Sequence, residues 1–246
     1  MNRWLTRPGP DPHARLRLFC FPYSGAGASI YYRWIGQLPA GIDVCPVELP
    51  GRGSRLAEPP FSRIAELSEA AAEALLPYLD RPFAFFGHSM GALACFELAR
   101  LLRRRHGLQP VRLIASGHPA PQMPDREPPI HALPEPQFVE KLREFGGTPE
   151  EVLANAELRE LILPILRADF AVCETYAYEP EAPLDCPISA YGGLQDREVL
   201  TEELDAWRTQ TARTFTARMF PGDHFFIHSA QPLVLRSVAR DLVGEE

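Results

Sequence analysis

Several features that would direct this sequence toward particular classes of protein are scarce or missing. Its 246 residues include five cysteines and no C-x-x-C pair, which gives no sign of a zinc site or a disulfide framework. Basic residues number 25 against 32 acidic ones, a net charge of −7, so a general electrostatic grip on nucleic acid is not expected. No run approaches the roughly 18 apolar residues that span a bilayer. We therefore expect no metal, no cofactor, no nucleic-acid partner and no membrane association.

The amino-terminal segment also lacks the apolar core of a secretion signal. Residues 1–17 mix arginines with prolines and contain no apolar stretch before the first predicted strand. Cys20, Cys45 and Cys95 fall in apolar runs, where a free cysteine behaves as a small buried hydrophobe. Both observations favour a cytoplasmic protein.

From residue 16 onward, short apolar runs alternate with longer segments of helical periodicity, which is typical of βαβ units around a mostly parallel sheet. Strands are predicted at Leu16–Tyr23, Val44–Leu49, Phe83–Phe86, Val111–Ser116, Pro187–Tyr191 and Phe215–Phe220. Helices are predicted at Ala28–Leu38, Ile64–Leu79, Met90–Arg105, Thr201–Thr211 and Pro232–Leu242. The chain length suits one α/β domain over residues 1–246 with a doubly wound sheet.

One interval, about 118–184, breaks this alternation with helical rather than strand patterns. Its first part, through Pro136, is rich in proline and should be extended. Thr148 stands where an N-cap would precede a helix, and apolar residues recur at helical spacing over 158–170, with Pro164 expected to kink that helix. Long insertions in compact domains are usually functional, so a helical lid over a site is predicted rather than an ordinary helical layer.

The strongest local signal is the G-x-S-x-G sequence formed by Gly87, Ser89 and Gly91. It lies between an apolar strand and a helix, which is the context of a nucleophile elbow. The flanking glycines are needed because side chains there would collide with the neighbouring strand and helix. Ser89 is therefore predicted to be a nucleophile exposed at the carboxyl edge of the sheet.

A serine hydroxyl needs a neighbouring base to become a good nucleophile, and seven histidines compete for that role. His224 follows the last predicted strand, where this kind of fold delivers its base in the order serine, acid, histidine. His228 is the alternative, with a capping or surface role otherwise. His88 is expected to pack or hydrogen-bond locally, and His118 and His131 to be solvent or lid residues.

The acid that orients the base should lie at the carboxyl end of a strand between Ser89 and His224. Asp196 meets this condition, because the strand Pro187–Tyr191 runs directly into the loop that contains it. Asp223 adjoins the histidine and is interpreted as a loop-capping residue. Asp185 precedes its strand and falls at the wrong edge.

The oxyanion formed on attack needs two N–H donors. Met90, the residue after the nucleophile, should supply one, and Ser24 or Tyr23 in the glycine-rich loop 21–27 should supply the other. A phosphate loop is the alternative reading of these glycines, but the third glycine and the lysine of nucleotide motifs are missing.

Five segments together are more specific than the elbow alone, and they resemble type II thioesterases, the stand-alone editing enzymes of polyketide and nonribosomal peptide synthesis. The segments are Leu18–Gly25, Glu48–Gly53, Phe86–Ala92, Cys186–Asp196 and Phe220–Phe226. The resemblance covers nearly the whole chain. It implies an α/β-hydrolase fold, the same three catalytic residues, a helical lid, and acyl groups presented on the phosphopantetheine arm of an acyl or peptidyl carrier protein.

The sequence departs from the family pattern at Ser24, at Ala26 between two glycines, and at Asp223, which leaves the acyl preference open. The apolar insertion helix and Met90 suggest an apolar acyl pocket. Arg52 and Arg55 either meet a phosphate or an acidic carrier surface, or are solvated residues of a turn.

Three rival functions remain at the level of sequence. A carboxylesterase or lipase, or an acyltransferase, would use the same triad. A catalytically inactive partner of a synthase is the non-enzymatic alternative, and the intact candidates at all three triad positions count against it.

Overall fold

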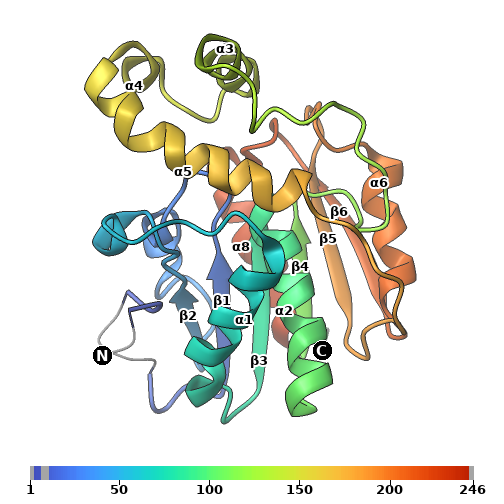
Figure 1. Ribbon diagram of the computed structural model, residues 1–246. Coiled ribbons are helices and arrows are strands. Elements are labelled where there is room, and N and C mark those ends of the chain that lie inside the picture. The colour runs from blue at the N-terminus through green and yellow to red at the C-terminus, as the bar shows by residue number, and fades with distance from the viewer. Residues whose placement is uncertain (1–2, 7–10, 244–246) are drawn as a thin grey trace.

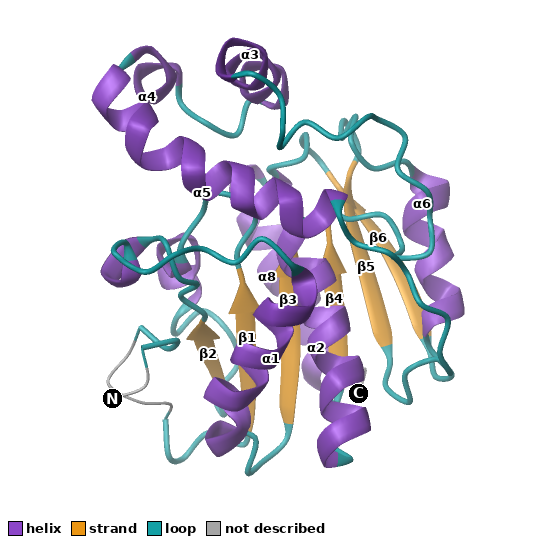
Figure 2. Ribbon diagram, viewed as in Figure 1, coloured by secondary structure: helices purple, strands orange, loops and turns teal. Residues whose placement is uncertain are grey.

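The computed structural model describes residues 3–6 and 11–243, so part of the amino-terminal segment interpreted above lies outside the described residues. Six parallel strands form one sheet in the order β2-β1-β3-β4-β5-β6 (Figures 1 and 2). They are β1 (Leu16–Phe21), β2 (Ile42–Pro46), β3 (Phe83–His88), β4 (Arg112–Ser116), β5 (Ile188–Gly193) and β6 (Phe215–Phe220). The predicted mostly parallel sheet with flanking helices is confirmed.

Helices cover both faces of this sheet, because successive strand residues point to opposite sides. Phe19 and Phe85 pack toward one face, and their neighbours Leu18 and Phe86 pack toward the other. The first face is covered by α1 (Ile64–Leu75), α2 (Met90–His106), α6 (Thr201–Asp205) and the 3₁₀ helix η4 (Ala206–Gln210). The second is covered by the 3₁₀ helix η1 (Ala28–Trp34), α7 (Phe226–Ser229) and α8 (Gln231–Val243).

Several predicted boundaries need correction. The first strand ends at Phe21 because Pro22 cannot continue the ladder, and the second lies about two residues earlier than predicted. The predicted helix 28–38 is a 3₁₀ helix that ends at Trp34, shortly before Gly36 adopts a φ of 76°. The predicted helix 201–211 changes from α to 3₁₀ after Asp205.

The segment between β4 and β5, residues 117–187, is called the insertion below. It contains α3 (Glu135–Phe145), α4 (Glu150–Ala154) and α5 (Ala156–Glu174). Figure 1 shows α5 crossing above the carboxyl ends of the strands, with α3 and α4 beyond it. These helices share a small hydrophobic core of their own, formed with Phe138, Leu142, Leu153 and Leu166 among others.

One local prediction for the insertion is wrong. Pro149 rather than Thr148 occupies the N-cap position of α4, with an extended backbone and no side-chain cap. Leu158 and Leu161 lie on the exposed face of α5, 40% and 55% exposed, although they match the apolar spacing. The helix runs without interruption through Pro164. Asn155 caps α5 instead, where its side chain accepts a hydrogen bond of 3.1 Å from Leu158 N.

The predicted burial of Cys20, Cys45 and Cys95 is confirmed, and no disulfide joins any of the five cysteines, all of which lie within the described residues. None of the described helices combines the length and the apolar character needed to cross a bilayer.

Candidate active site

Ser89 occupies a strained turn between β3 and α2. Its φ of 53° and ψ of −122° make it the one non-glycine residue of the described ranges at positive φ. A Cβ on Gly87 would lie 2.0 Å from Gly91 O, and one on Gly91 would lie 2.3 Å from Phe21 O. The glycine spacing is therefore required by close packing of strand, helix and neighbouring loop. This geometry presents the half-buried Ser89 side chain at the carboxyl edge of the sheet, as the motif predicts.

Asp196 and His224 meet because β5 and β6 are neighbouring strands and both residues follow a carboxyl end. His224 Nδ1 lies 3.0 Å from Asp196 Oδ2. The other oxygen, Oδ1, accepts backbone N–H bonds from Glu198 at 2.8 Å and Val199 at 3.3 Å. Because a carboxylate accepts at Nδ1, that nitrogen carries a proton and Nε2 is left free to accept one.

Ser89 and His224 are not hydrogen-bonded to each other within the described residues. Instead, His224 Nε2 lies 3.7 Å from Glu198 Oε2. Loose nucleophile–base geometry is common in substrate-free enzymes and tightens when substrate binds. Sequence reasoning missed Glu198, although its place two residues after the candidate acid could have indicated it.

His88, the residue before Ser89, contacts the candidate base His224. Its Nε2 donates to His224 O at 2.9 Å, and its Nδ1 is 2.9 Å from Ser116 Oγ. Burial lowers the pKa of His88 well below its ordinary value, so the ring is neutral and Nδ1 accepts from the hydroxyl. The packing expected for His88 is present, since its ring is fully buried against those of Tyr23 and Phe226, and its hydrogen-bond partner His224 is 136 residues away in the chain.

The remaining histidines have other partners. His228 Nε2 lies 3.1 Å from the hydroxyl of Tyr23, and His131 Nδ1 lies 2.5 Å from Glu174 Oε2 within the insertion. Burial lowers the pKa of His118 to about 4. His224 is therefore the histidine that is paired with a carboxylate at the end of a sheet strand.

The two acids set aside by sequence behave as expected. Asp223 Oδ1 accepts the N–H of Phe225 at 2.9 Å, a loop cap. Asp185 pairs with Arg213 before β5, at the opposite edge of the sheet.

The loop after β1 lies across from the first turn of α2. Met90 is the first residue of that helix, so its N–H has no acceptor within the helix. In the described residues the N–H groups of Tyr23 and Ser24 also donate to no other group, whereas Gly25 N donates to Asp169 Oδ2 of α5 at 2.7 Å. The N–H groups of Tyr23 and Ser24 thus both remain candidates for the second oxyanion donor. The N–H of Gly25 is excluded, because it already donates to Asp169.

Comparison with known proteins identifies the family. The thioesterase-domain family model matches residues 16–242. The gramicidin S biosynthesis protein GrsT of Aneurinibacillus migulanus is 45% identical over 242 residues, covering 98% of this chain and 94% of the relative. This chain belongs to the thioesterase family.

Solved structures agree with this assignment. RedJ, a thioesterase from the prodiginine pathway of Streptomyces coelicolor, is 37% identical with a TM-score of 0.87 over 98% of both chains. BorB, the type II thioesterase of the borrelidin cluster, is 36% identical with a TM-score of 0.86 over 97% of this chain and 96% of that chain. The fold is the α/β-hydrolase fold of thioesterases, and the resemblance read from the five sequence segments is confirmed.

Arg52 and Arg55 of this thioesterase fit neither alternative considered from sequence. Arg52 is 5% exposed and forms two bonds, of 2.7 and 2.8 Å, to the carboxylate of Asp169. Arg55 is 6% exposed, pairs with Glu58 at 2.6 Å and lies over the ring of Trp4. Neither is solvated and neither is free for a phosphate. Sequence reasoning missed Asp169. The signal in the sequence is an acidic residue among the apolar residues of the predicted helix 158–170.

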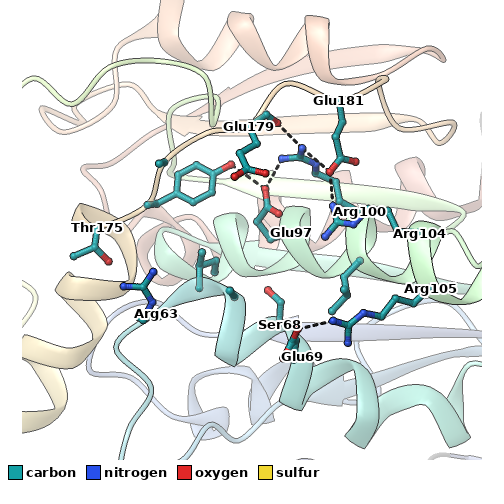
Figure 3. A pocket seen from close by; sticks show the side chains of 15 residues that line it. Arg63, Ser68, Glu69, Glu97, Arg100, Arg104, Arg105, Thr175, Glu179 and Glu181 are labelled. Carbon is teal, nitrogen blue, oxygen red and sulfur yellow. Dashed lines mark hydrogen bonds and ion pairs between the residues drawn. The ribbon is translucent and has the colours of Figure 1, made fainter.

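Two cavities of the thioesterase lie away from the candidate triad, and both are lined largely by polar residues. One of about 380 Å³ is lined by Gly25 of the loop after β1 and by Arg52 of the chain after β2, among others. The other, of about 530 Å³, lies between α1, α2 and the chain after α5 (Figure 3). The expected apolar acyl pocket coincides with neither, and the Met90 side chain is fully buried in the core.

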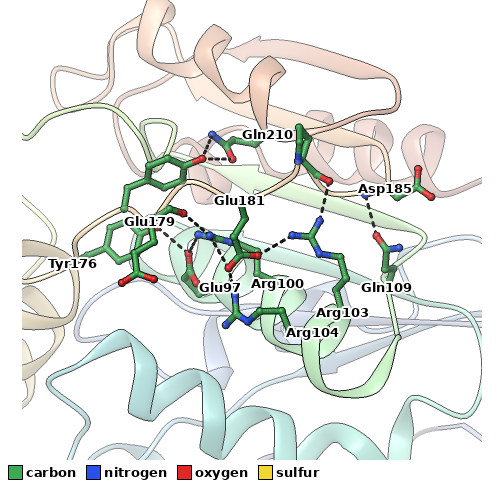
Figure 4. Close-up of polar contacts among 12 residues, drawn as sticks. Glu97, Arg100, Arg103, Arg104, Gln109, Tyr176, Glu179, Glu181, Asp185 and Gln210 are labelled. Carbon is green, nitrogen blue, oxygen red and sulfur yellow. Dashed lines mark hydrogen bonds and ion pairs between the residues drawn. The ribbon is translucent and has the colours of Figure 1, made fainter.

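The part of the insertion that follows α5 is bound to α2 by ion pairs and a hydrogen bond beside the larger cavity (Figure 4). Glu181 pairs with Arg100 and Arg103, both at 2.9 Å, and also with Arg104. The Tyr176 hydroxyl donates to Glu97 Oε1 at 2.8 Å. These contacts therefore connect the chain just after α5 to α2, the helix that begins immediately after Ser89.

The acidic limb of the pH–rate profile should lie at higher pH than an ordinary histidine would give. Burial lowers the pKa of His224, but the hydrogen bond to Asp196 and the charges of Glu198, Asp196 and Asp223 outweigh it, so the net pKa is raised from about 6.5. As the candidate base, His224 must be neutral to accept a proton, so we expect activity to be lost as pH falls through that raised value. The dependence of kcat/KM on pH measures it.

Glu198→Gln tests the cause of this shift. Removing the charge near Nε2 should lower the pKa of His224 and move the acidic limb to lower pH. Glu202→Gln, an exposed residue of the same region, is the matched control and should leave the limb in place. If the acidic limb of Glu198→Gln stayed at the wild-type pH or moved to higher pH, Glu198 would not be a cause of the raised pKa of His224.

Proposed function

We propose that this thioesterase hydrolyses acyl thioesters carried on the phosphopantetheine arm of acyl or peptidyl carrier proteins, in polyketide or nonribosomal peptide assembly. The observation that carries the proposal is the 3.0 Å contact of His224 with Asp196, whose side chain is 0% exposed, at the same sheet edge as the strained Ser89. The biosynthetic roles in the names of GrsT and RedJ support the substrate class.

In the proposed mechanism, Ser89 Oγ attacks the thioester carbonyl while His224 Nε2 takes its proton. The N–H of Met90 and that of Ser24 or Tyr23 would hold the oxyanion, each contributing about 3 kcal/mol. Collapse of the tetrahedral intermediate breaks the C–S bond, and His224 returns the proton to the leaving thiolate. Water then attacks the acyl-enzyme by the same route and releases a free acid and Ser89.

The insertion, residues 117–187 in the structure and about 118–184 as predicted from sequence, is proposed to act as a lid within one domain spanning 1–246. A Cβ on Gly147, between α3 and α4, would lie 2.5 Å from the Phe225 ring beside His224. A Cβ on Gly25 would lie 2.6 Å from Leu166 of α5. The insertion therefore packs against two of the loops that carry candidate site residues, the loop of His224 and loop 21–27. We expect the enzyme in the cytoplasm, where carrier-bound intermediates are made.

Substrate preference tests the function. Because binding energy from remote parts of a substrate can raise the reaction rate, kcat/KM on acyl-carrier thioesters should exceed that on the matching N-acetylcysteamine thioesters and p-nitrophenyl esters. A steady-state panel with one acyl group on all three carriers measures this. Faster cleavage of simple oxygen esters would favour a carboxylesterase, and product appearing only with an added alcohol or amine would favour an acyltransferase.

A further inference from the structure

A buried carboxylate of the insertion reaches the loop that carries the candidate oxyanion donors. Asp169 of α5 is 1% exposed, and its Oδ2 accepts from Gly25 N and from Arg52 Nη1, both at 2.7 Å. Its Oδ1 accepts from Arg52 Nη2 at 2.8 Å. Every contact joins segments far apart in the chain, since Asp169 is 144 residues from Gly25 and 117 from Arg52.

Arg52 completes the link from the other side of the same loop. Its Nη1 also donates to Ala26 O at 3.2 Å, and its Nε donates to Pro50 O at 3.2 Å. The loop residues next to Ser24 are therefore held at an N–H by Asp169 and at a carbonyl by Arg52. Gly25 also has a φ of 79°, which favours glycine. A side chain at this position would collide with Leu166 of α5.

The helix that carries Asp169 is itself anchored. Its carboxyl end is tied to α2 through Tyr176 and Glu97, and the chain that follows is tied to α2 through Glu181 and Arg100 (Figure 4). Figure 1 shows α5 lying directly above the sheet edge, whereas α3 and α4 lie farther out. The helix can thus act as a fixed support for the loop beneath it.

We propose that Asp169 and Arg52 are positioning residues that hold loop 21–27 so that the N–H of Ser24 or Tyr23 is aimed at the oxyanion. The inference rests on the proposed acyl-transfer function of Ser89. An oxyanion donor has to be in place before charge develops, because its value comes from preorganisation. A bidentate arginine–carboxylate pair fixes both distance and direction, which a single contact does not. On this view the insertion does more than cover the site, because α5 also shapes it.

Asp169→Asn tests the proposal with little change of side-chain volume. We expect kcat to fall about 100-fold with KM changed less than about threefold, since a misplaced donor mainly weakens transition-state binding. The loss should be similar for acetyl and long-acyl thioesters. Hydrogen–deuterium exchange of peptides covering residues 21–28 should become faster. Arg52→Lys, which keeps the charge but loses the bidentate geometry, should give the same pattern in weaker form.

Asp241→Asn is the matched control. Asp241 is 7% exposed, pairs with Arg218 at 2.6 Å and accepts from the Tyr191 hydroxyl at 2.7 Å, away from this loop. It should lower the melting temperature while leaving kcat and the exchange of loop 21–28 near wild type. Equal effects of Asp169→Asn and Asp241→Asn on kcat would mean that the Arg52 pair is only structural.

The double variant Arg52→Lys with Asp169→Asn separates a shared role from two separate ones. If the two residues act as a unit, the combined loss in kcat should be much smaller than the product of the single losses. Unchanged exchange of loop 21–28 together with unchanged kcat in Asp169→Asn would overturn the proposal. Failure of the proposed function would look different, because Ser89→Ala would then remain active whatever the exchange of the loop showed.

Discussion

Replacement of Ser89 by alanine should lower turnover by about six orders of magnitude, the scale seen when a serine hydrolase loses its nucleophile. The physical reason is that alanine leaves no hydroxyl at the strained turn before α2, where φ is 53°. Steady-state hydrolysis of an acyl-carrier thioester measures the loss. The residual rate should be that of binding and oxyanion stabilisation alone.

Covalent labelling provides the control for this prediction. A fluorophosphonate should modify wild-type protein once, at Ser89, and should not modify Ser89→Ala. Ser116→Ala serves as a neighbouring serine variant that keeps the labelled site. Labelling that persists in Ser89→Ala, or activity near wild type, would show that another group is the nucleophile.

Asp196→Asn should cost about 10⁴ in turnover, through the wrong histidine tautomer. The N–H groups of Glu198 and Val199 both donate to Oδ1, so the amide oxygen of an asparagine would stay there. Its NH₂ group would then face His224 Nδ1 and require that nitrogen to accept. The proton would move to Nε2, which could no longer take one from Ser89. Steady-state kinetics at a pH above the acidic limb measures the loss.

Asp223→Asn is the comparison for this second prediction. In the described structure the Asp223 side chain accepts one hydrogen bond, from the N–H of Phe225, and an asparagine oxygen can accept the same bond. We expect a loss below about tenfold, with the acidic limb moved to lower pH because one charge near His224 is gone. If the two substitutions exchanged their effects, Asp223 would be the acid and the order of the triad would need revision.

The order of elements and the elbow were predictable because both depend on local chemistry. Alternating apolar runs follow from burial of short strands, and the glycines around Ser89 follow from a turn that leaves no room for Cβ atoms. Asp196 and His224 could be chosen for a similar reason, since carboxyl ends of neighbouring parallel strands share one edge. Helix ends and caps were predicted less well. Thr148 matched a capping pattern that the chain does not use.

The sequence by itself determined the parallel sheet, the family and the candidate triad, because each rests on residues within one short segment or on the order of such segments. Only the tertiary structure decided the partners of the buried charges. Arg52 pairs with Asp169, which is 117 residues away in the chain, and His88 donates to the carbonyl of His224, which is 136 residues away. No local pattern specifies such pairs, since burying a charge is tolerated only where the folded chain supplies its counterpart. The link between the insertion and the loop beside Ser89 is therefore a property of the fold.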